Sequence, residues 1–203
     1  MVGDTEIILP APETKGKISV EEAISRRSSV RDYRDEPISL EQLSQLLWAA
    51  QGITHGDSLR AAPSAGATYP LELFVLAGSV EGLKSGVYRY DVSSHSLHLH
   101  LEEDHRHELT DMSSFHQDFI AQVPLDIVIC AVYERTTDLY GERGVRYVHM
   151  DTGHAAENIA LQAVALGLDT VMVGAFDDDS VIKVLRLPDD IKPLYIIPIG
   201  KRK

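Results

Sequence analysis

Three arginines and two serine hydroxyls fall within six residues, from Arg26 to Arg31. A guanidinium group always carries a positive charge and can bind two phosphate oxygens at once, and a serine hydroxyl adds a further hydrogen bond. The residue types therefore indicate a phosphate-binding segment. The alternative is an exposed helix end, where the arginines only complement the helix dipole.

Two further segments consist of small residues. One runs from Pro63 to Ala67, and the other is Gly174-Ala175, directly after the apolar run Val171–Val173. Small residues let the backbone approach a flat ligand closely and leave its N–H groups open. Together with the basic segment they predict a pocket for a phosphorylated planar cofactor, although each could also be a tight turn.

The net charge and the distribution of apolar residues argue against several classes of function. The chain of 203 residues has a formal net charge of −12, which argues against a nucleic-acid or anionic-membrane surface. No run of ~18 apolar residues and no signal-peptide core is present. We therefore expect a cytoplasmic protein that binds neither nucleic acid nor membrane.

Other catalytic chemistries find little support. Cys130 lies within an apolar strand pattern, and Ser64 is not in a Gly-x-Ser-x-Gly motif. No Gly-x-Gly-x-x-Gly or Walker sequence occurs. His149 and His154 are five residues apart and do not share a helix face, so packed histidines are favoured over a metal site, and we expect none.

Hydrophobic periodicity predicts a single α+β domain over residues 18–203, preceded by an extended arm over residues 1–17. Ser39 and Gln42 form a capping-box pattern at the start of a helix that Gly52 can end, and Gly167 can end a long helix. The expected helices are 20–25, 40–53, 104–112, 114–122, 145–166 and 178–185, and the expected strands are 71–77, 86–90, 97–101, 125–132, 169–173 and 194–199.

The chain resembles the FMN-dependent nitroreductase superfamily and, within it, the SagB-type dehydrogenases. The motifs that carry the resemblance occur in order over nearly the whole chain: residues 26–33 (RRSSVRDY), 43–52 (LSQLLWAAQG), 62–72 (APSAGATYPLE), 86–90 (GVYRY), 153–158 (GHAAEN) and 174–178 (GAFDD). The resemblance implies a nitroreductase-like sandwich, a mainly antiparallel sheet flanked by helices, in an intertwined homodimer.

The resemblance also implies roles for individual residues. Arg27, Ser28 and Ser29 would hold the FMN phosphate, Arg31 would reach the flavin N1–C2=O edge, and Lys201 and Arg202 would complete the phosphate site. A second subunit would supply the residues that line the flavin ring, Pro63, Ser64, Ala65 and Gly66. Gly174 and Ala175 would present a backbone N–H to flavin N5, and Tyr140 and Phe176 would face the substrate.

The implied activity is ping-pong hydride transfer through FMN, from NADH or NADPH to a small electrophilic acceptor. One departure from the family keeps alternatives open. The azoline-oxidising members carry a Lys-Tyr pair that aligns with Leu139-Tyr140, so the lysine is missing. The alternatives are an FMN-binding subunit of a modification or redox-sensing complex, and an azoline dehydrogenase acting on a modified peptide.

Overall fold

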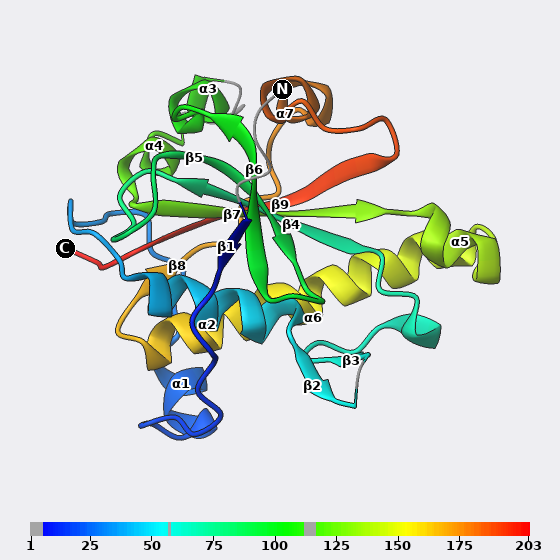
Figure 1. The fold of residues 1–203 in the computed structure, drawn as a ribbon, viewed down its shortest axis with the longest axis horizontal. Coiled ribbons are helices and arrows are strands. Elements are labelled where there is room, and N and C mark those ends of the chain that lie inside the picture. The colour runs from blue at the N-terminus through cyan, green and yellow to red at the C-terminus, as the bar shows by residue number, and fades with distance from the viewer. Residues whose placement is uncertain (1–5, 57, 112–116) are drawn as a thin grey trace.

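A seven-stranded antiparallel sheet forms the centre of the protein, in a computed structural model that describes residues 6–56, 58–111 and 117–203 (Figure 1). The strand order is β1-β6-β5-β4-β7-β9-β8. The strands are β1 (Glu6–Ile8), β4 (Leu71–Ala77), β5 (Gly86–Asp91), β6 (Ser96–Glu102), β7 (Leu125–Val132), β8 (Asp169–Thr170) and β9 (Ile191–Gly200). The predicted α+β class and antiparallel sheet are confirmed.

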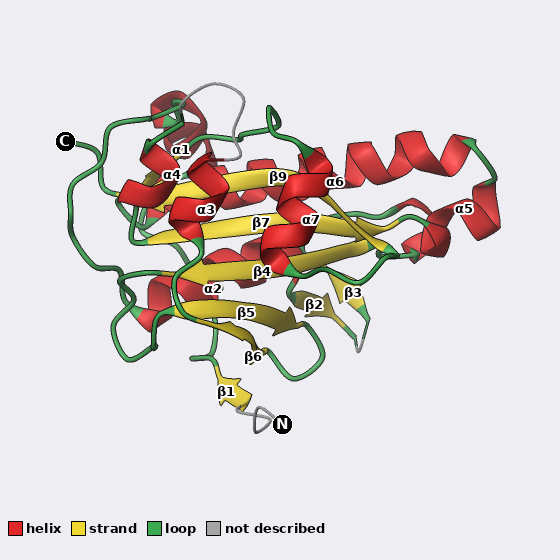
Figure 2. Cartoon of the chain, turned by 90° about the horizontal axis from the view of Figure 1, so that it is seen from above, coloured by secondary structure: helices red, strands yellow, loops and turns green. Residues whose placement is uncertain are grey.

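Helices cover both faces of the sheet (Figure 2). The helices α2 (Leu40–Gln51) and α6 (Arg143–Ala165) lie on one face, and α3 (Arg106–Asp111), α4 (Phe119–Gln122) and α7 (Asp178–Leu185) lie on the other. Every residue of β4 and β7 is buried, as expected for strands covered on both sides. Leu73 and Val75 join the core under α2 and α6, whereas Phe74 and Leu76 join the core under α3 and α7.

Local signals explain where the helices begin and end. Ser39 and Gln42 form the predicted capping box of α2, and Gly52 is its C-terminal cap. Gly167, with φ of 71°, follows the C-cap of α6 as predicted. The bounds predicted for α7 are confirmed, and α1 (Val20–Arg26) is one residue longer than predicted.

The predicted strand 169–173 was wrong in its length. In β8 only Asp169 and Thr170 pair with β9, and Val173 rejoins the same register through a bridge to Ile196. In that register Val171 lies opposite Pro198, whose nitrogen carries no hydrogen, so the ladder is interrupted there.

Five elements were not predicted. They are β1, the hairpin of β2 (Ile53–His55) with β3 (Leu59–Arg60), the single-turn helix η1 (Ala65–Ala67), and α5 (Glu134–Tyr140). Ile53 was predicted to extend the α2 face, but it lies in β2 because Gly52 ends the helix. The predicted helix 114–122 is observed from Phe119 onward, and its residues 114–116 lie outside the described residues.

The N-terminal segment runs from the sheet to α2. Glu6–Ile8 pairs with β6, and the Ser44 hydroxyl donates to the Pro10 carbonyl. The domain boundary at residue 17 stays a prediction. Within the described residues, no helix combines the length and apolar character needed to cross a bilayer.

Candidate functional site

The basic segment is held by its backbone against two other parts of the chain. Ser29 forms a bridge with Thr170 of β8, and the Val30 N–H donates to the Thr170 carbonyl at 3.1 Å. Arg34 N–H donates to the Lys201 carbonyl at 2.8 Å. Because these bonds involve only the backbone, they fix the segment while leaving its side chains free to bind a ligand.

The C-terminal cations come to the same edge of the sheet, but they have different partners. Arg202 forms an ion pair with Asp169, which raises the pKa of its guanidinium, and also donates to the Ser28 hydroxyl at 3.1 Å. Lys201 instead pairs with Glu36 at 2.7 Å. The structure therefore brings Arg202 to the predicted phosphate site, whereas the Lys201 ammonium already forms an ion pair with Glu36.

Two arginines of this edge, Arg27 and Arg31, leave most of their guanidinium N–H donors without an acceptor among the described residues. The nearest carboxylate to Arg27 is Glu157, at 3.8 Å, which is longer than a hydrogen bond. Arg31 is exposed and forms no ion pair with any described carboxylate. A phosphate dianion fits these donors, because charge-assisted bonds to guanidinium groups are strong and geometrically matched. We name Arg27, Ser28, Ser29, Arg31 and Arg202 the basic edge.

The small-residue segment forms an exposed turn at the start of β4. Gly66 and Ala67 have φ of 60° and 52°, and the Ser64 hydroxyl accepts a hydrogen bond from the Tyr69 N–H at 3.0 Å. A Cβ atom on Gly66 would lie 2.6 Å from the Tyr140 hydroxyl oxygen. Glycine is therefore required here by both the backbone conformation and the neighbouring side chain.

A buried carboxylate lies beneath this turn. Asp151 of α6 is only 4% exposed, and burial raises the pKa of its side chain. Hydrogen bonds from the Ser64 hydroxyl and the Ala65 N–H partly offset that rise in pKa. Our sequence analysis missed this residue, although a carboxylate on the same helix face as the apolar Val148 and Ala155 is a visible signal.

The backbone at Gly174 points its N–H away from the sheet. Val173 exchanges both of its hydrogen bonds with Ile196, each at 2.9 Å. In an antiparallel ladder, the residue next to such a pair directs its N–H and C=O to the opposite side of the strand. The Gly174 N–H therefore faces away from β9, and a Cβ on Gly174 would come within 3.3 Å of the Tyr195 ring.

The two predicted substrate residues differ in surroundings. Tyr140 is 37% exposed, lies against Gly66 and packs edge-on against Tyr147, with ring centroids 5.1 Å apart. Phe176 is half-buried and packs against the core under α7. The neighbouring Leu139 is 62% exposed.

The basic edge and the small-residue turn contact different sides of α6. Arg27 is next to Glu157, whereas Ser64 is next to Asp151. Six residues advance a helix by about 9 Å and separate two side chains by about 120° around its axis. Figure 1 places α1 near the C-terminal end of α6. The basic edge and the small-residue turn of one chain therefore face different sides of α6.

Cys130 was predicted to be a buried thiol and His149 to be packed or hydrogen-bonded, and the contacts of both residues agree with this. Cys130 is fully buried, and burial raises the pKa of its thiol. His149 shares a hydrogen bond of 2.7 Å with the Tyr133 hydroxyl. Across residues 6–56, 58–111 and 117–203, no group of three or more potential metal ligands comes together.

Comparison with known proteins gives a consistent family. The model of the "Nitroreductase family" matches residues 24–201. The nitroreductase-named protein MJ1384 of Methanocaldococcus jannaschii is 45% identical over 202 residues, which is 99% of each chain. An FMN reductase (NAD(P)H) of Bacillus subtilis is 25% identical over 192 residues, 88% of this chain and 64% of its own length.

Two solved structures show the same fold. A nitroreductase-named protein of Ralstonia eutropha superimposes with a TM-score of 0.83 and 28% identity, over 100% of this chain and 92% of its own. A chain of the Escherichia coli microcin synthetase McbBCD complex, with truncated pro-MccB17 bound, gives a TM-score of 0.78 and 26% identity, over 94% and 75% of the two chains.

Proposed function

The chain belongs to the nitroreductase family of oxidoreductases, and from this premise we propose that it is an FMN-dependent enzyme that passes hydride from NADH or NADPH to a small electrophilic acceptor. The observation that carries the proposal is the basic edge, where Arg27 and Arg31 keep their donors in a chain with a net charge of −12. The relative named as an FMN reductase supports the choice of cofactor.

In this proposal the basic edge holds the FMN phosphate. Arg27 and Arg202 supply guanidinium donors, and the hydroxyls of Ser28 and Ser29 add hydrogen bonds. Lys201 plays a smaller part than the family resemblance implies, because Glu36 already neutralises its charge.

Two groups of the chain act on the flavin ring. Arg31 carries a permanent positive charge and would stabilise negative charge at the N1–C2=O edge. The Gly174 N–H would donate to flavin N5, with Ala175 continuing the exposed backbone. The bound flavin supplies the hydride chemistry, and the protein supplies position and charge. Tyr140 and Phe176 would border the substrate.

The separation of the two segments around α6 supports a homodimer. Pro63, Ser64, Ala65 and Gly66 of a second copy would line the flavin held by the basic edge of the first. Exposed apolar side chains near α1 and α6 are available for such an interface, namely Val20, Ile24, Val145 and Met150. Stable obligate dimers bury on the order of 2,000–5,000 Å². We also propose that the enzyme acts in the cytoplasm.

Anaerobic reduction tests the proposed activity. The purified protein is saturated with FMN, and its flavin absorbance is followed after addition of NADPH or NADH. We expect the flavin bands to bleach and to return when a quinone or nitroaromatic acceptor is added. Sedimentation of the FMN-bound protein at micromolar concentration should give a dimer. A monomer with FMN tightly bound would contradict the two-chain site.

The similarity to the McbBCD structure favours a second candidate, an azoline dehydrogenase acting on a modified peptide. At the position of the expected lysine, Leu139 is exposed beside Gly66, so a longer cationic side chain has room there. The test compares native protein with Leu139→Lys on an azoline peptide. Activity in either would favour this candidate, and inactivity of both would exclude it. Bound FMN that no donor reduces would instead favour the non-catalytic FMN-binding subunit.

A further inference from the structure

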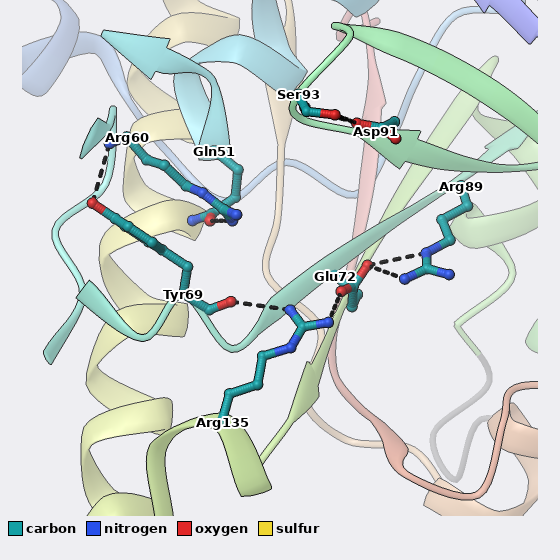
Figure 3. Close-up of polar contacts among 8 residues, drawn as sticks. All are labelled: Gln51, Arg60, Tyr69, Glu72, Arg89, Asp91, Ser93 and Arg135. Atoms are coloured by element: carbon teal, nitrogen blue, oxygen red, sulfur yellow. Dashed lines mark hydrogen bonds and ion pairs between the residues drawn. The ribbon is translucent and has the colours of Figure 1, made fainter. Parts of the chain in front are cut away.

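A cavity of about 560 Å³ opens between the start of β4 and the end of β5. Its walls carry three arginines from three separate elements: Arg60 of β3, Arg89 of β5 and Arg135 of α5 (Figure 3). Glu72, Tyr90, Asp91, Ser93 and His98 complete the polar part of the wall. Such a concentration of guanidinium groups is unexpected in an acidic chain.

This cavity is distinct from the basic edge. The cavity lies at β4 and β5, whereas the basic edge is attached to β8. The sheet order places β4, β7 and β9 between β5 and β8. The three strand spacings from β4 to β8 amount to roughly 14 Å, and the four from β5 to roughly 19 Å. A ligand in the cavity therefore uses different residues from those proposed to hold FMN.

The carboxylates of the cavity already have partners. Glu72 Oε2 accepts hydrogen bonds from Arg89 Nε and NH2 at 3.0 and 2.9 Å, and Glu72 Oε1 pairs with Arg135. Asp91 accepts from the Ser93 N–H and hydroxyl, which lower the pKa of its carboxyl group. With both carboxylates ionised, three guanidinium groups face two negative charges, and the wall is positive by one.

Arg60 carries this excess charge. Its guanidinium donates to Gln51 Oε1 at 2.9 Å and stacks on the Tyr69 ring at 4.4 Å from the centroid. In the described part of the chain it forms no ion pair within 4.0 Å. Burial is the largest influence on the pKa of Arg60 and lowers it. The charge of Glu72 raises this pKa without forming an ion pair with Arg60, and an incoming anion would further offset the cost of the poorly solvated cation.

Hydrogen-bond donors remain for such an anion. Each guanidinium group has five N–H donors. The contacts among described residues use two donors of Arg89, two of Arg135 and one of Arg60. In Figure 3 the side chains of Arg89 and Arg135 converge on Glu72 from opposite sides, and the Arg60 guanidinium lies on the Arg135 side.

We propose that this cavity is an oxyanion-binding site, which takes the carboxylate or phosphate group of a small ligand on Arg60, with Arg135 as the neighbouring donor. The single excess positive charge matches one anionic group. Tyr69 holds both arginines in place, because its ring stacks under Arg60 and its carbonyl accepts from Arg135 at 3.1 Å.

Thermal unfolding of the FMN-saturated protein tests the site, with inorganic phosphate and succinate as probes and sodium chloride at matched ionic strength. We expect a concentration-dependent rise in Tm with at least one probe, because a ligand that binds only the folded state stabilises it. The probe that acts identifies the anionic group. No rise with either probe up to millimolar concentrations overturns the proposal.

Variants of Arg60 test whether the rise in Tm comes from binding at this residue. In Arg60→Gln or Arg60→Met, which remove the positive charge but keep an extended side chain, the apparent affinity should fall about tenfold or more. Lys84→Gln removes one exposed positive charge elsewhere and should leave the affinity unchanged. If a folded Arg60 variant binds as tightly as native protein, the proposal is wrong.

A variant-free measurement covers the case in which both Arg60 variants fail to fold. Native protein is treated with phenylglyoxal, and modified arginines are located by peptide mass spectrometry with and without the probe. Arg60 or Arg135 should be protected, and exposed Arg186 should not. Equal modification with and without probe would contradict the proposal. If the protein binds no FMN, the same measurements on Arg27→Ala separate the cavity from the basic edge.

Discussion

Two arginine clusters lie at different places on the sheet. One is held in place by backbone hydrogen bonds, and the other by ion pairs of its side chains. In the basic edge the backbone is fixed to Thr170 and Lys201, while the Arg27 and Arg31 side chains have no close carboxylate. Around Glu72 the arginine side chains are themselves tied together through one buried carboxylate. The same residue type is therefore kept for a ligand in one place and used mainly to hold the structure in the other.

The chain has 31 acidic and 19 basic residues. In this comparison, the arginines with open donors lie at the proposed phosphate site, and the arginines that share a buried carboxylate form a structural contact. Arg60 lies beside the Glu72 cluster. Like Arg27 and Arg31, however, it keeps open donors and has no close ion pair with a described carboxylate.

The largest expected effect is on FMN binding. Arg27→Ala removes charge-assisted bonds to the phosphate and should weaken FMN affinity by about 10- to 150-fold, measured by quenching of FMN fluorescence. Arg26→Ala is the matched control, because Arg26 pairs with Glu22 on the same helix. Equal losses in the two variants would mean that the basic edge acts only through its general charge.

Removing the carboxylate of the second cluster should affect stability instead. Glu72→Gln leaves Arg89 and Arg135 without their shared partner and should lower the free energy of unfolding by about 2 kcal/mol, less than for a fully buried pair because both arginines are partly exposed. Urea unfolding measures the change. Glu22→Gln, in an exposed pair, should change it by less than about 0.5 kcal/mol.

The small-residue turn before β4 has a conformational requirement at one residue. Gly66→Ala should lower the free energy of unfolding by about 1–2 kcal/mol, because its left-handed backbone disfavours a side chain and Tyr140 must move. Ala67→Gly, at φ of 52°, should leave stability unchanged or raise it slightly. If both variants lose stability equally, the requirement is not local to Gly66.

The smallest effect concerns pH. Burial raises the pKa of Asp151, so the folded protein holds this proton more tightly than the unfolded chain. The resulting stabilisation is present below the unfolded pKa of about 3.9 and is lost as pH rises through the raised folded pKa. Asp151→Asn should therefore be more stable than native protein at pH 7, and the difference should shrink toward pH 4. Parallel pH profiles would contradict this assignment.

The sequence predicted the elements that local signals determine. The capping box at Ser39 and Gln42 and the glycine after α6 were read correctly because they depend on neighbouring residues. The short β8 was not, because its interruption comes from Pro198, which is distant in the chain but opposite in register. α5 was missed because its only buried residue is Thr136, which leaves no apolar periodicity.

The candidate site, like the fold, could be predicted from the sequence only in part. The family resemblance named the residues of the basic edge, and the structure brings Arg202 to Ser28 although 174 positions separate them. The spacing of residues in the sequence could not show that Glu36 pairs with Lys201, or that Asp151 lies beneath Ser64. It also gave no sign that Arg60, Glu72 and Arg135 meet, since each comes from a different element.

The two outermost strands of the sheet are also its shortest, with three residues in β1 and two in β8. An exposed strand edge offers unpaired N–H and C=O groups to any neighbouring chain, and long flat edges promote fibrous aggregation. Here the long apolar strands β4 and β7 lie in the interior, the backbone of Ser29 and Val30 covers β8 at Thr170, and the described part of β1 is too brief to template another strand. The same arrangement should keep the protein resistant to sheet-mediated aggregation when it is concentrated.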